Sequence, residues 1–377
     1  MFVKVKQTEL SEALEKIIVT TSKSAKNIPG ASAVRIVFRE DSLIFYGRSR
    51  NDSIMVKVPT EESNGGDCYF GVSCIDLKKL VDTFHMKDEP VLLVYDEVAE
   101  SAAKPLCVKY GSSMFNLWSL GPEHMSPIED FGNMEYNDLD LGEFLHGLRL
   151  VAYCMHPERE SMNGVNVDEK YLAATDGMRL SLYENTQLLS GLDGGSIMIS
   201  PESVVRILSI FKGGKGEKEA YACDQTSLTI IKDRICYRTR LRVAKFPNYL
   251  SVLPKGPHTP CSVSRVETLA SLERIVAMSN QTASSATLSL YPDQEEIRMS
   301  TKSDKGDVED LVEMEYDGPE FSLKMNPKFL IEIIKRLRGD NIVYKFAFTD
   351  SRRKLNQIVE ISEGPYRNFL NPMKDDS

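Results

Sequence analysis

The sequence has few of the residues that build disulfide frameworks, metal sites or membrane spans. Its seven cysteines and five histidines are scattered along 377 residues, and no Cys-x-x-Cys motif occurs. We therefore expect reduced, mostly packed thiols and no metal or other cofactor. No apolar run approaches the roughly 18 residues of a membrane span, and the segment Met1–Gln7 alternates like a strand and lacks the apolar block of a signal peptide. These absences predict a cytoplasmic protein that does not bind a membrane.

Motifs for catalysis are incomplete. A zinc deaminase signature fails because Ser264 stands where its second cysteine is required. The triplet Thr175-Asp176-Gly177 reverses the order of an aspartic-protease triplet and has no second copy to complete the carboxylate pair. The glycine-rich stretch 212–216 lacks the Gly-x-x-x-x-Gly-Lys-Ser/Thr spacing of a phosphate-binding loop. We predict that the protein is not an enzyme. A catalytic role for Asp176 would need a neighbouring base, nucleophile or metal.

Acidic residues outnumber basic ones, with 55 Asp and Glu against 46 Lys and Arg and a net charge of −9. A chain with this balance does not attract nucleic acid as a whole, so DNA binding would require that its cations gather on one face. The hydrophobic content of 42% is sufficient for several domains with cores of their own.

One pattern recurs along the chain with a period of roughly 125 residues. Apolar residues at helical spacing predict two helices in each third, beginning near Thr8, Ile75, Leu141, Pro201, Val266 and Pro327. The predicted apolar stripes include Leu10, Leu14 and Ile17 in the first helix, Val204, Leu208 and Phe211 in the fourth, and Leu269, Ala270 and Val276 in the fifth. Alternating or β-branched runs between them, such as 33–38 and 42–46, predict strands. The sequence therefore predicts an α+β fold of three similar domains, each with two helices packed on antiparallel sheet. Pro-bearing junctions place these domains at 1–133, 134–254 and 255–377.

Basic residues lie on the predicted polar faces of these helices. On a helical wheel they fall opposite or beside the apolar stripes, and the candidates for DNA contact are Lys23, Lys79, Arg149, Arg206, Arg274, Lys328, Lys335 and Arg338. Dispersed Lys and Arg of this kind contact phosphates without reading bases. An ordinary solvated helix face is the alternative interpretation, because Glu12, Glu202 and Glu332 share these faces.

The segment Ala174–Leu180 (ATDGMRL) is similar to the ATDGHRL stretch in the middle domain of the bacterial DNA polymerase III β subunits, the sliding clamps. Phe246–Pro254, Met278–Gln281 and Asn371–Lys374 resemble three later segments of that family, in the same order. The resemblance covers essentially the whole chain, although it is thin in the first domain.

This resemblance implies a head-to-tail homodimer, a ring in which helices line the hole and sheets lie outside. Such a ring encircles duplex DNA without sequence preference and tethers polymerase, clamp loader and repair proteins through short linear motifs. A strand at 114–118 would meet the third domain of the other subunit, where two residues lie off the predicted core stripe of their helix. The implied interface residues are Phe115, Leu117, Ile275 and Met278. A clamp-like interaction module that does not close into a ring is the alternative.

The same resemblance implies a peptide-binding cleft beside the middle and third domains. Its residues would be Met162, Thr175, Gly177, Met178, Arg179, Leu180, Pro247, Val252, Phe329, Asn371, Pro372 and Met373. Peptide anchors fill apolar clefts of this kind, and methionines can reshape around different anchors. A place in the core is the alternative for Met162 and Leu180.

The sequence departs from the family pattern within this cleft. Met178 stands where the family has histidine, and Leu250 and Ser251 stand where it has arginines. At the second subsite Arg352 replaces an aliphatic residue, so an acidic or polar peptide residue is expected there. The peptide preference is therefore expected to differ from that of the family.

Overall fold

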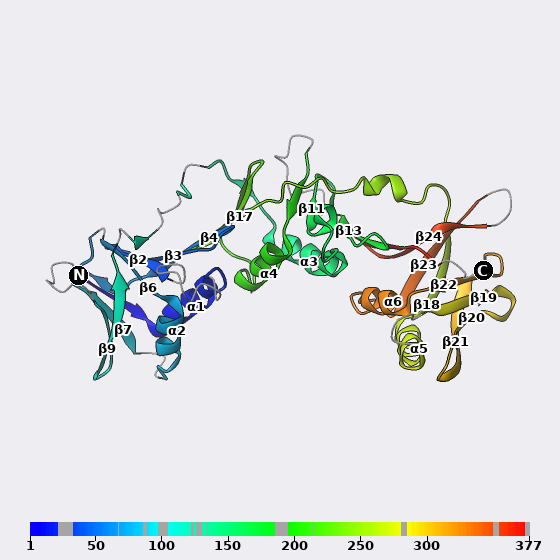
Figure 1. Ribbon diagram of the computed structural model, residues 1–377, viewed down its shortest axis with the longest axis horizontal. Helices are drawn as coiled ribbons and strands as arrows, with labels where there is room; N and C mark the ends of the chain where they lie inside the picture. Colours follow the sequence, from blue (N-terminus) through cyan, green and yellow to red (C-terminus); the bar gives the residue numbers. More distant parts are fainter. Residues whose placement is uncertain are drawn as a thin grey trace. The chain divides into compact units, whose positions relative to one another are not determined.

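The computed structural model describes residues 1–21, 33–66, 68–85, 89–96, 105–121, 124–125, 130–132, 134–184, 195–212, 214–279, 285–349 and 354–373. These residues form two compact units. The first holds those within Met1–Leu145 and Glu202–Val243, and the second those within His146–Leu189, Gly194–Pro201 and Ala244–Ser377. Each unit contains one antiparallel sheet (Figure 1). The α+β class predicted from the sequence is confirmed.

Helices form at all six predicted places. They are α1 (Gln7–Ile18), α2 (Cys74–Asp82), α3 (Leu141–Val151), α4 (Pro201–Ile210), α5 (Arg265–Met278) and α6 (Pro327–Ile334). The side chains of Ser73, Ser264 and Asn326 accept hydrogen bonds from first-turn N–H groups of α2, α5 and α6, which fixes where these helices begin. α1 packs beside α2 in the first unit, and α5 packs beside α6 in the second (Figure 1).

The sheet of the first unit has the strand order β10-β15-β16-β17-β4-β3-β2-β6-β9-β8-β7-β1-β5. Its strands are β1 (Phe2–Lys6), β2 (Ala33–Phe38), β3 (Ser42–Arg48), β4 (Asp52–Pro59), β5 (Glu62–Ser63), β6 (Cys68–Ser73), β7 (Pro90–Tyr95), β8 (Pro105–Tyr110), β9 (Ser113–Leu120), β10 (Asn137–Asp138), β15 (Glu219–Cys223), β16 (Ser227–Lys232) and β17 (Ile235–Arg240).

The sheet of the second unit has the order β14-β11-β12-β13-β25-β24-β23-β18-β21-β20-β19-β22. Its strands are β11 (Val165–Val167), β12 (Tyr171–Thr175), β13 (Arg179–Glu184), β14 (Ile197–Ile199), β18 (Thr259–Ser264), β19 (Ala286–Tyr291), β20 (Glu296–Ser303), β21 (Gly306–Tyr316), β22 (Phe321–Met325), β23 (Asn341–Thr349), β24 (Lys354–Glu363) and β25 (Tyr366–Leu370).

The order of elements recurs three times along the chain. A strand, a helix and four or five further strands precede the second helix, and three strands follow it. In this recurrence β4, β13 and β21 are equivalent, and so are the closing strands β9, β17 and β25. The repeat inferred from the sequence is therefore visible in the secondary structure.

Equivalent strands join neighbouring repeats. β4 of the first repeat pairs with β17 of the second, and β13 of the second pairs with β25 of the third. We call these two joins the β4–β17 seam and the β13–β25 seam. The two equivalent strands that remain are β9 of the first repeat and β21 of the third, and each has a stretch with only one neighbouring strand. Among the described strands, residues 113–118 of β9 pair with β8 alone, and residues 306–313 of β21 pair with β20 alone.

The buried face of α5 differs from the predicted one. The apolar pattern predicted a stripe through Leu269, Ala270 and Val276, but these residues are only half-buried. The helix instead buries Thr268, Ser271, Leu272 and Ile275. The expectation that Ile275 faces a partner subunit is therefore wrong, because its side chain has 0% exposure. Two small polar residues lie on the buried face, so hydrophobicity alone does not mark it.

The thiols are packed as expected. None of the seven cysteines forms a disulfide, and five of them are buried. Burial raises the pKa of Cys74 and of Cys154 to about 12, so both remain protonated and unreactive near neutral pH. No helix in the described part of the chain is long and apolar enough to cross a membrane.

Candidate functional site

The motif Ala174–Leu180 forms a closed turn between β12 and β13. The Asp176 carboxylate accepts hydrogen bonds from the backbone N–H groups of Met178 and Arg179, each at 3.0 Å, and from Arg179 Nε at 2.9 Å. Thr175 Oγ1 donates to the carbonyl of Arg179 at 2.7 Å. Gly177 has φ +89°, a left-handed conformation that favours glycine. Asp176 thus has both carboxylate oxygens engaged in holding the turn, which accounts for it without catalysis.

This turn is one wall of a cavity of about 460 Å³ in the second unit. Nine of the twelve residues expected to form a peptide cleft line it: Met162, Thr175, Gly177, Met178, Arg179, Leu180, Pro247, Val252 and Asn371. The floor belongs to a core cluster that includes Leu180, Tyr249 and Phe369. Leu180 is 5% exposed, so it serves the core and the cavity together.

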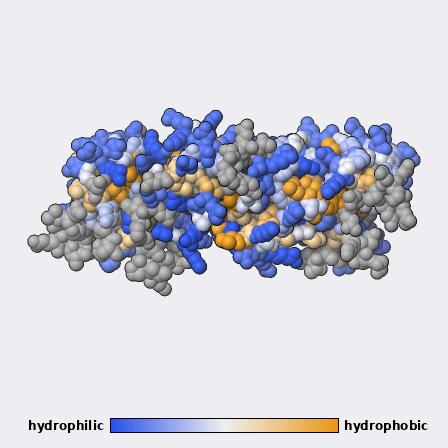
Figure 2. Space-filling view, turned by 90° about the horizontal axis from the view of Figure 1, so that it is seen from above, coloured by the Kyte–Doolittle hydropathy of each residue, from blue (hydrophilic) through white to orange (hydrophobic). Residues whose placement is uncertain are grey.

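Apolar side chains at the rim of this cavity are open to solvent. Met178 is 53% exposed and Val252 is 52% exposed, and Leu250 beside them is 52% exposed. In the space-filling view the surface is mostly hydrophilic, with apolar side chains gathered in separate patches (Figure 2). An apolar cleft with an exposed apolar rim is suited to one or two apolar anchors of an extended peptide.

Sequence reasoning missed four lining residues and included three that do not line the cavity. The missed ones are Asn248, Tyr249, Ile358 and Phe369. Tyr249 lies inside the recognised 246–254 segment, but Ile358 and Phe369 come from β24 and β25, which only the folded sheet brings here. Of the three others, Phe329 lies on α6, and Met373 forms a bridge with Lys324 of β22 beside Pro372.

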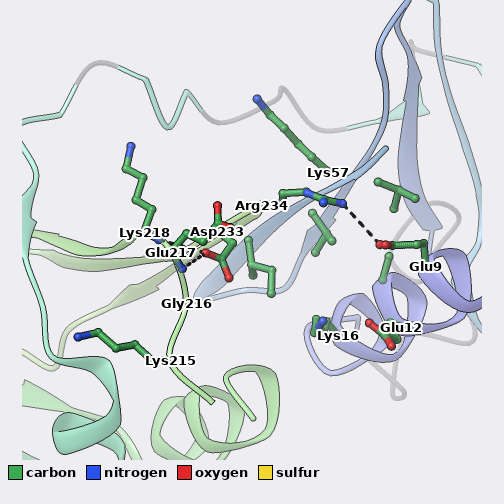
Figure 3. Close-up of a pocket in the computed structure, with 14 residues that line it drawn as sticks. Glu9, Glu12, Lys16, Lys57, Lys215, Gly216, Glu217, Lys218, Asp233 and Arg234 are labelled. Carbon is green, nitrogen blue, oxygen red and sulfur yellow. Dashed lines mark hydrogen bonds and ion pairs between the residues drawn. The ribbon is translucent and has the colours of Figure 1, made fainter. Parts of the chain in front are cut away.

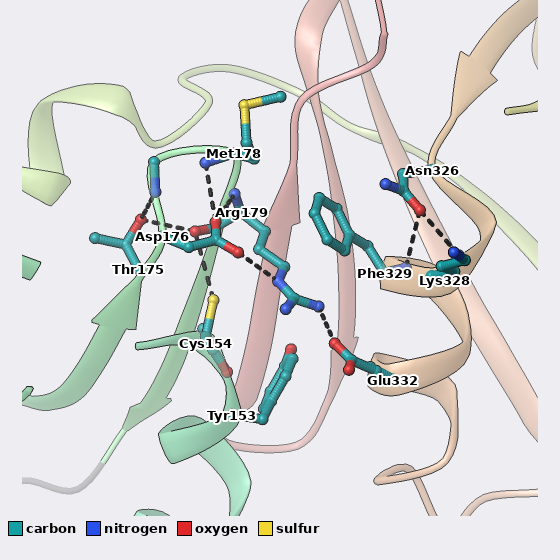
Figure 4. Close-up of polar contacts among 12 residues, drawn as sticks. Tyr153, Cys154, Thr175, Asp176, Met178, Arg179, Asn326, Lys328, Phe329 and Glu332 are labelled. Atoms are coloured by element: carbon teal, nitrogen blue, oxygen red, sulfur yellow. Dashed lines mark hydrogen bonds and ion pairs between the residues drawn. The ribbon is translucent and has the colours of Figure 1, made fainter. Parts of the chain in front are cut away.

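Arg179 anchors α6 to the turn (Figure 4). Its guanidinium lies 4.1 Å from the ring centre of Phe329 and 4.9 Å from that of Tyr153, and it forms an ion pair with Glu332. Burial lowers the pKa of Arg179, but the hydrogen bond with Glu332 and the charge of Asp176 outweigh burial and raise it overall. The side chain is 8% exposed, so Arg179 supports the wall of the cavity and does not present an exposed positive charge to a ligand.

The candidate DNA contacts divide into exposed and paired cations. Lys79, Arg149, Lys328 and Arg338 are exposed, as predicted. Arg274 and Lys335 are also exposed but are paired with carboxylates, Arg274 with Asp310 at 2.7 Å and Lys335 with Glu273 at 2.9 Å. Lys23 lies outside the described residues.

Arg206 departs from the prediction. It forms an ion pair with Asp52 of β4, whose side chain is completely buried, and is itself 25% exposed. Val204 and Phe211 of the predicted stripe are buried, but Leu208 is only half-buried, and the buried face extends instead to Ser203, Ile207 and Ile210. Arg206 therefore lies at the edge of the packed face and supports the β4–β17 seam.

The open part of β9 carries apolar residues outward. Met114 is 61% exposed, and Trp118, the single tryptophan of the chain, is 74% exposed. Phe115 and Leu117 point to the other side and are half-buried. On α5, Met278 is half-buried, and its carbonyl accepts a hydrogen bond from Ser303 at 2.6 Å. A strand edge with unpaired backbone groups and exposed apolar residues favours pairing with another strand.

A second cavity, of about 560 Å³, lies in the first unit and is mainly charged (Figure 3). Glu9 of α1 forms an ion pair with Arg234 at 3.5 Å, and Asp233 accepts hydrogen bonds from the backbone of Glu217 and Lys218. Its described lining residues include no serine, cysteine or histidine. Among the residues that the structure describes, no three His, Cys, Asp or Glu side chains gather as a metal site.

Known proteins share this fold and parts of the sequence. Residues 250–363 match the family described as DNA polymerase III beta subunit, C-terminal domain. The beta sliding clamp of Bacillus subtilis is 22% identical over 359 residues, covering 93% of both chains. The DNA polymerase III beta subunits of Pseudomonas aeruginosa and Thermotoga maritima superpose with TM-scores of 0.85 and 0.81, at 18% and 20% identity, over 99% of this chain and 100% and 99% of theirs.

Proposed function

We propose that this chain, a divergent relative of the bacterial β sliding clamps, is itself a DNA sliding clamp. Two copies would close into a ring around duplex DNA and hold a polymerase at the primer end. The three repeats, with expected boundaries at 1–133, 134–254 and 255–377, would supply six domains to the ring. The protein would act by topology and tethering, without catalysis of its own.

The observation that carries this proposal is the repetition of one strand seam. The chain uses it twice, between β4 and β17 and between β13 and β25, and leaves the equivalent edges of β9 and β21 open. Within one chain these two strands have no further partners among the described strands. Pairing β9 of one copy with β21 of a second would repeat the seam, and doing so in both directions closes a dimer with heterologous contacts.

The exposed cations support weak contact with phosphates. Lys79 lies on α2, Arg149 on α3 and Lys328 on α6, so each repeat supplies one of them, and Arg338 follows the end of α6. Contacts of this kind are sequence-independent and weaken as salt rises, because phosphate binding releases counterions. A closed ring needs no tight binding to stay on DNA, so the net charge of −9 is compatible with the proposal.

The apolar cavity at the β13–β25 seam supports the tethering step. Short linear motifs of polymerase, clamp loader and repair proteins would place one or two apolar side chains against Leu180 and Val252, with Met178 adapting to each. Tethering raises the effective concentration of the polymerase at the DNA end, so a modest peptide affinity is sufficient.

The test is retention on circular duplex DNA after loading. A topologically linked ring stays on nicked circular DNA and leaves when the DNA is cut once. Protein that dissociates at the same rate from circular and linear DNA, or that sediments as a monomer at micromolar concentration, would instead identify the alternative, a clamp-like module that does not close.

A further inference from the structure

A third cavity, of about 290 Å³, lies at the β4–β17 seam of the first unit. It is lined by the turn between β3 and β4, by the end of β17 and by the turn before β16. The lining residues include four arginines: Arg48, Arg50, Arg238 and Arg240.

The strand registers make this cavity the counterpart of the apolar one. Arg48 pairs with Ser53 across the β3–β4 turn, as Thr175 pairs with Leu180 across the β12–β13 turn. Across the seams, Ser53 pairs with Arg238 as Leu180 pairs with Phe369. These matches make seven lining positions of the two cavities equivalent. The pairs are Arg48 and Thr175, Arg50 and Gly177, Asn51 and Met178, Asp52 and Arg179, Ser53 and Leu180, Arg238 and Phe369, and Arg240 and Asn371.

Two further contacts confirm the equivalence independently of the strand pairing. The backbone N–H of Arg240 donates to the carbonyl of Asn51 at 2.8 Å, and that of Asn371 donates to the carbonyl of Met178 at 3.2 Å. Each seam also has one ion pair from the first residue of a strand to the sixth residue of a helix. These pairs are Asp52 with Arg206 of α4, and Arg179 with Glu332 of α6.

The chemistry of the two cavities is opposite although their strand registers match. Where the apolar cavity has Phe369 and Asn371, its counterpart has Arg238 and Arg240, and where the apolar one has Gly177, its counterpart has Arg50. The apolar floor residue Leu180 is replaced by Ser53. An apolar anchor gains little in such a site, whereas a carboxylate gains charge-assisted hydrogen bonds from guanidinium groups.

The two carboxylates in the lining are already engaged. Asp52 bonds to Arg206 and to the Tyr237 hydroxyl at 2.5 Å. Asp224 accepts hydrogen bonds from Thr226 and Ser227, each at 2.7 Å. Burial raises the pKa of Asp224, but these hydrogen bonds outweigh burial and lower it overall. Arg238 is engaged as well, because its guanidinium donates to Thr229 Oγ1 at 3.0 Å and to the carbonyl of Asp130 at 3.2 Å. The positive charge that the cleft presents therefore comes mainly from Arg50 and Arg240, which are exposed.

We propose that this cleft, lined by Arg50 and Arg240 at its exposed positions, binds an acidic extended segment of a partner protein. A concave site of this size receives side chains, whereas duplex DNA presents its phosphates on a convex surface, so a peptide fits better than DNA. In an extended segment, alternate side chains point the same way, so carboxylates at alternate positions would reach the arginines together. The inference rests on the proposed function only in taking the apolar cavity as a peptide cleft.

The experiment is a fluorescence anisotropy titration of the full chain with two labelled decapeptides. One has glutamate at alternate positions, and the other has leucine and phenylalanine anchors without charge. The variant Arg50→Ala with Arg240→Ala removes two exposed arginines of the cleft. The matched control, Lys57→Ala with Lys218→Ala, removes two exposed cations of the same unit that do not line it.

We expect the arginine variant to bind the acidic peptide about tenfold more weakly, since hydrogen bonds to charged groups are the stronger ones, and the lysine control to change affinity less than twofold. The apolar peptide should bind all three proteins alike. Three results would overturn the inference. The first is an equal loss of affinity for the acidic peptide in the arginine variant and the lysine control. The others are a dissociation constant for the acidic peptide above millimolar, and competition by duplex DNA or inorganic phosphate as strong as that by the unlabelled acidic peptide. Met178→Glu should lose affinity for the apolar peptide and keep its affinity for the acidic one, which separates the two sites. Failure of the acidic-peptide proposal can therefore be distinguished from failure of the proposed function.

Discussion

The ion pair between Arg206 and Asp52 allows a structural role to be separated from a DNA contact. Removing one partner of a buried pair destabilises a protein by about 3–5 kcal/mol, because the other charge is left buried. Here Tyr237 at 2.5 Å and Ser203 at 3.4 Å continue to bond to Asp52, and Arg206 is 25% exposed. We therefore expect Arg206→Met to lower the free energy of unfolding by about 2–3 kcal/mol.

Urea unfolding followed by circular dichroism measures this effect. With a slope of about 2–3 kcal/mol per molar for a unit of this size, the midpoint of the transition that includes the β4–β17 seam should fall by about 1 M. Lys79→Met is the matched control, because Lys79 is the sixth residue of α2 as Arg206 is of α4, and its side chain is exposed. Its midpoint should move by less than about 0.2 M.

A second variant tests the cause. Asp52→Asn in the Arg206→Met background removes the stranded charge and should restore about 1 kcal/mol. If Arg206→Met shifts the midpoint no more than Lys79→Met and weakens only the binding of duplex DNA, Arg206 is a DNA contact and the structural reasoning fails.

Four further outcomes are expected. Met178→Glu should weaken binding of a polymerase tail peptide at least tenfold and change stability by less than about 0.5 kcal/mol, because the side chain is 53% exposed. The control is Val205→Glu, since Val205 is also exposed but lies outside the cavity. If both variants bind the peptide equally well, the peptide site lies elsewhere. Trp118 emission should shift to longer wavelength on dilution, because the single tryptophan is 74% exposed in one chain and would be covered in the dimer; emission independent of concentration argues against pairing at β9. Lys79→Gln with Lys328→Gln should lower the slope of log affinity for duplex DNA against log salt by about 2, and an unchanged slope removes both from the DNA-facing set. Burial raises the pKa of Glu360, but hydrogen bonds from Arg367 and the charge of Lys345 outweigh burial and lower the pKa overall. The ionised carboxylate therefore stabilises the fold above about pH 4.3, and this stabilisation is lost as the pH falls through the pKa of the folded state. Glu360→Gln should flatten the acid dependence of the urea midpoint, and an acid profile identical to that of the parent would contradict this role.

The positions of the helices could be predicted because their periodicity survives in the sequence. Leu10, Leu14 and Ile17 are buried on α1 as the pattern required. The orientation of α5 could not be predicted, and that of α4 only in part, because Ser203, Thr268 and Ser271 lie on their buried faces. A hydrophobic pattern treats such residues as polar and rotates the expected stripe, which misplaced Arg206 and Ile275.

The candidate site could be predicted mainly where its residues belong to short segments that resemble the family, such as 174–180, 246–254 and 371–374. The turn 174–180 is closed by its own side chains, so a motif of seven residues identifies one complete wall of the cavity. Ile358 and Phe369 reach the same cavity through the pairing of β25 with β13 and β24. No local signal marks them, because their place depends on sheet order across about 190 residues, Leu180 being opposite Phe369.

The seams also locate where the proposed ring can open. At the β4–β17 and β13–β25 seams the two strands belong to one polypeptide, so after separating they meet again at an effective concentration in the millimolar range. In the proposed ring, the β9 and β21 edges that pair would belong to different molecules and would meet again only at the concentration of the protein. The same hydrogen-bond pattern would therefore act as a permanent joint in two places and as a gate in the third. A tandem fusion of two copies would convert one of the two gates into a hinge and leave a single entrance for DNA.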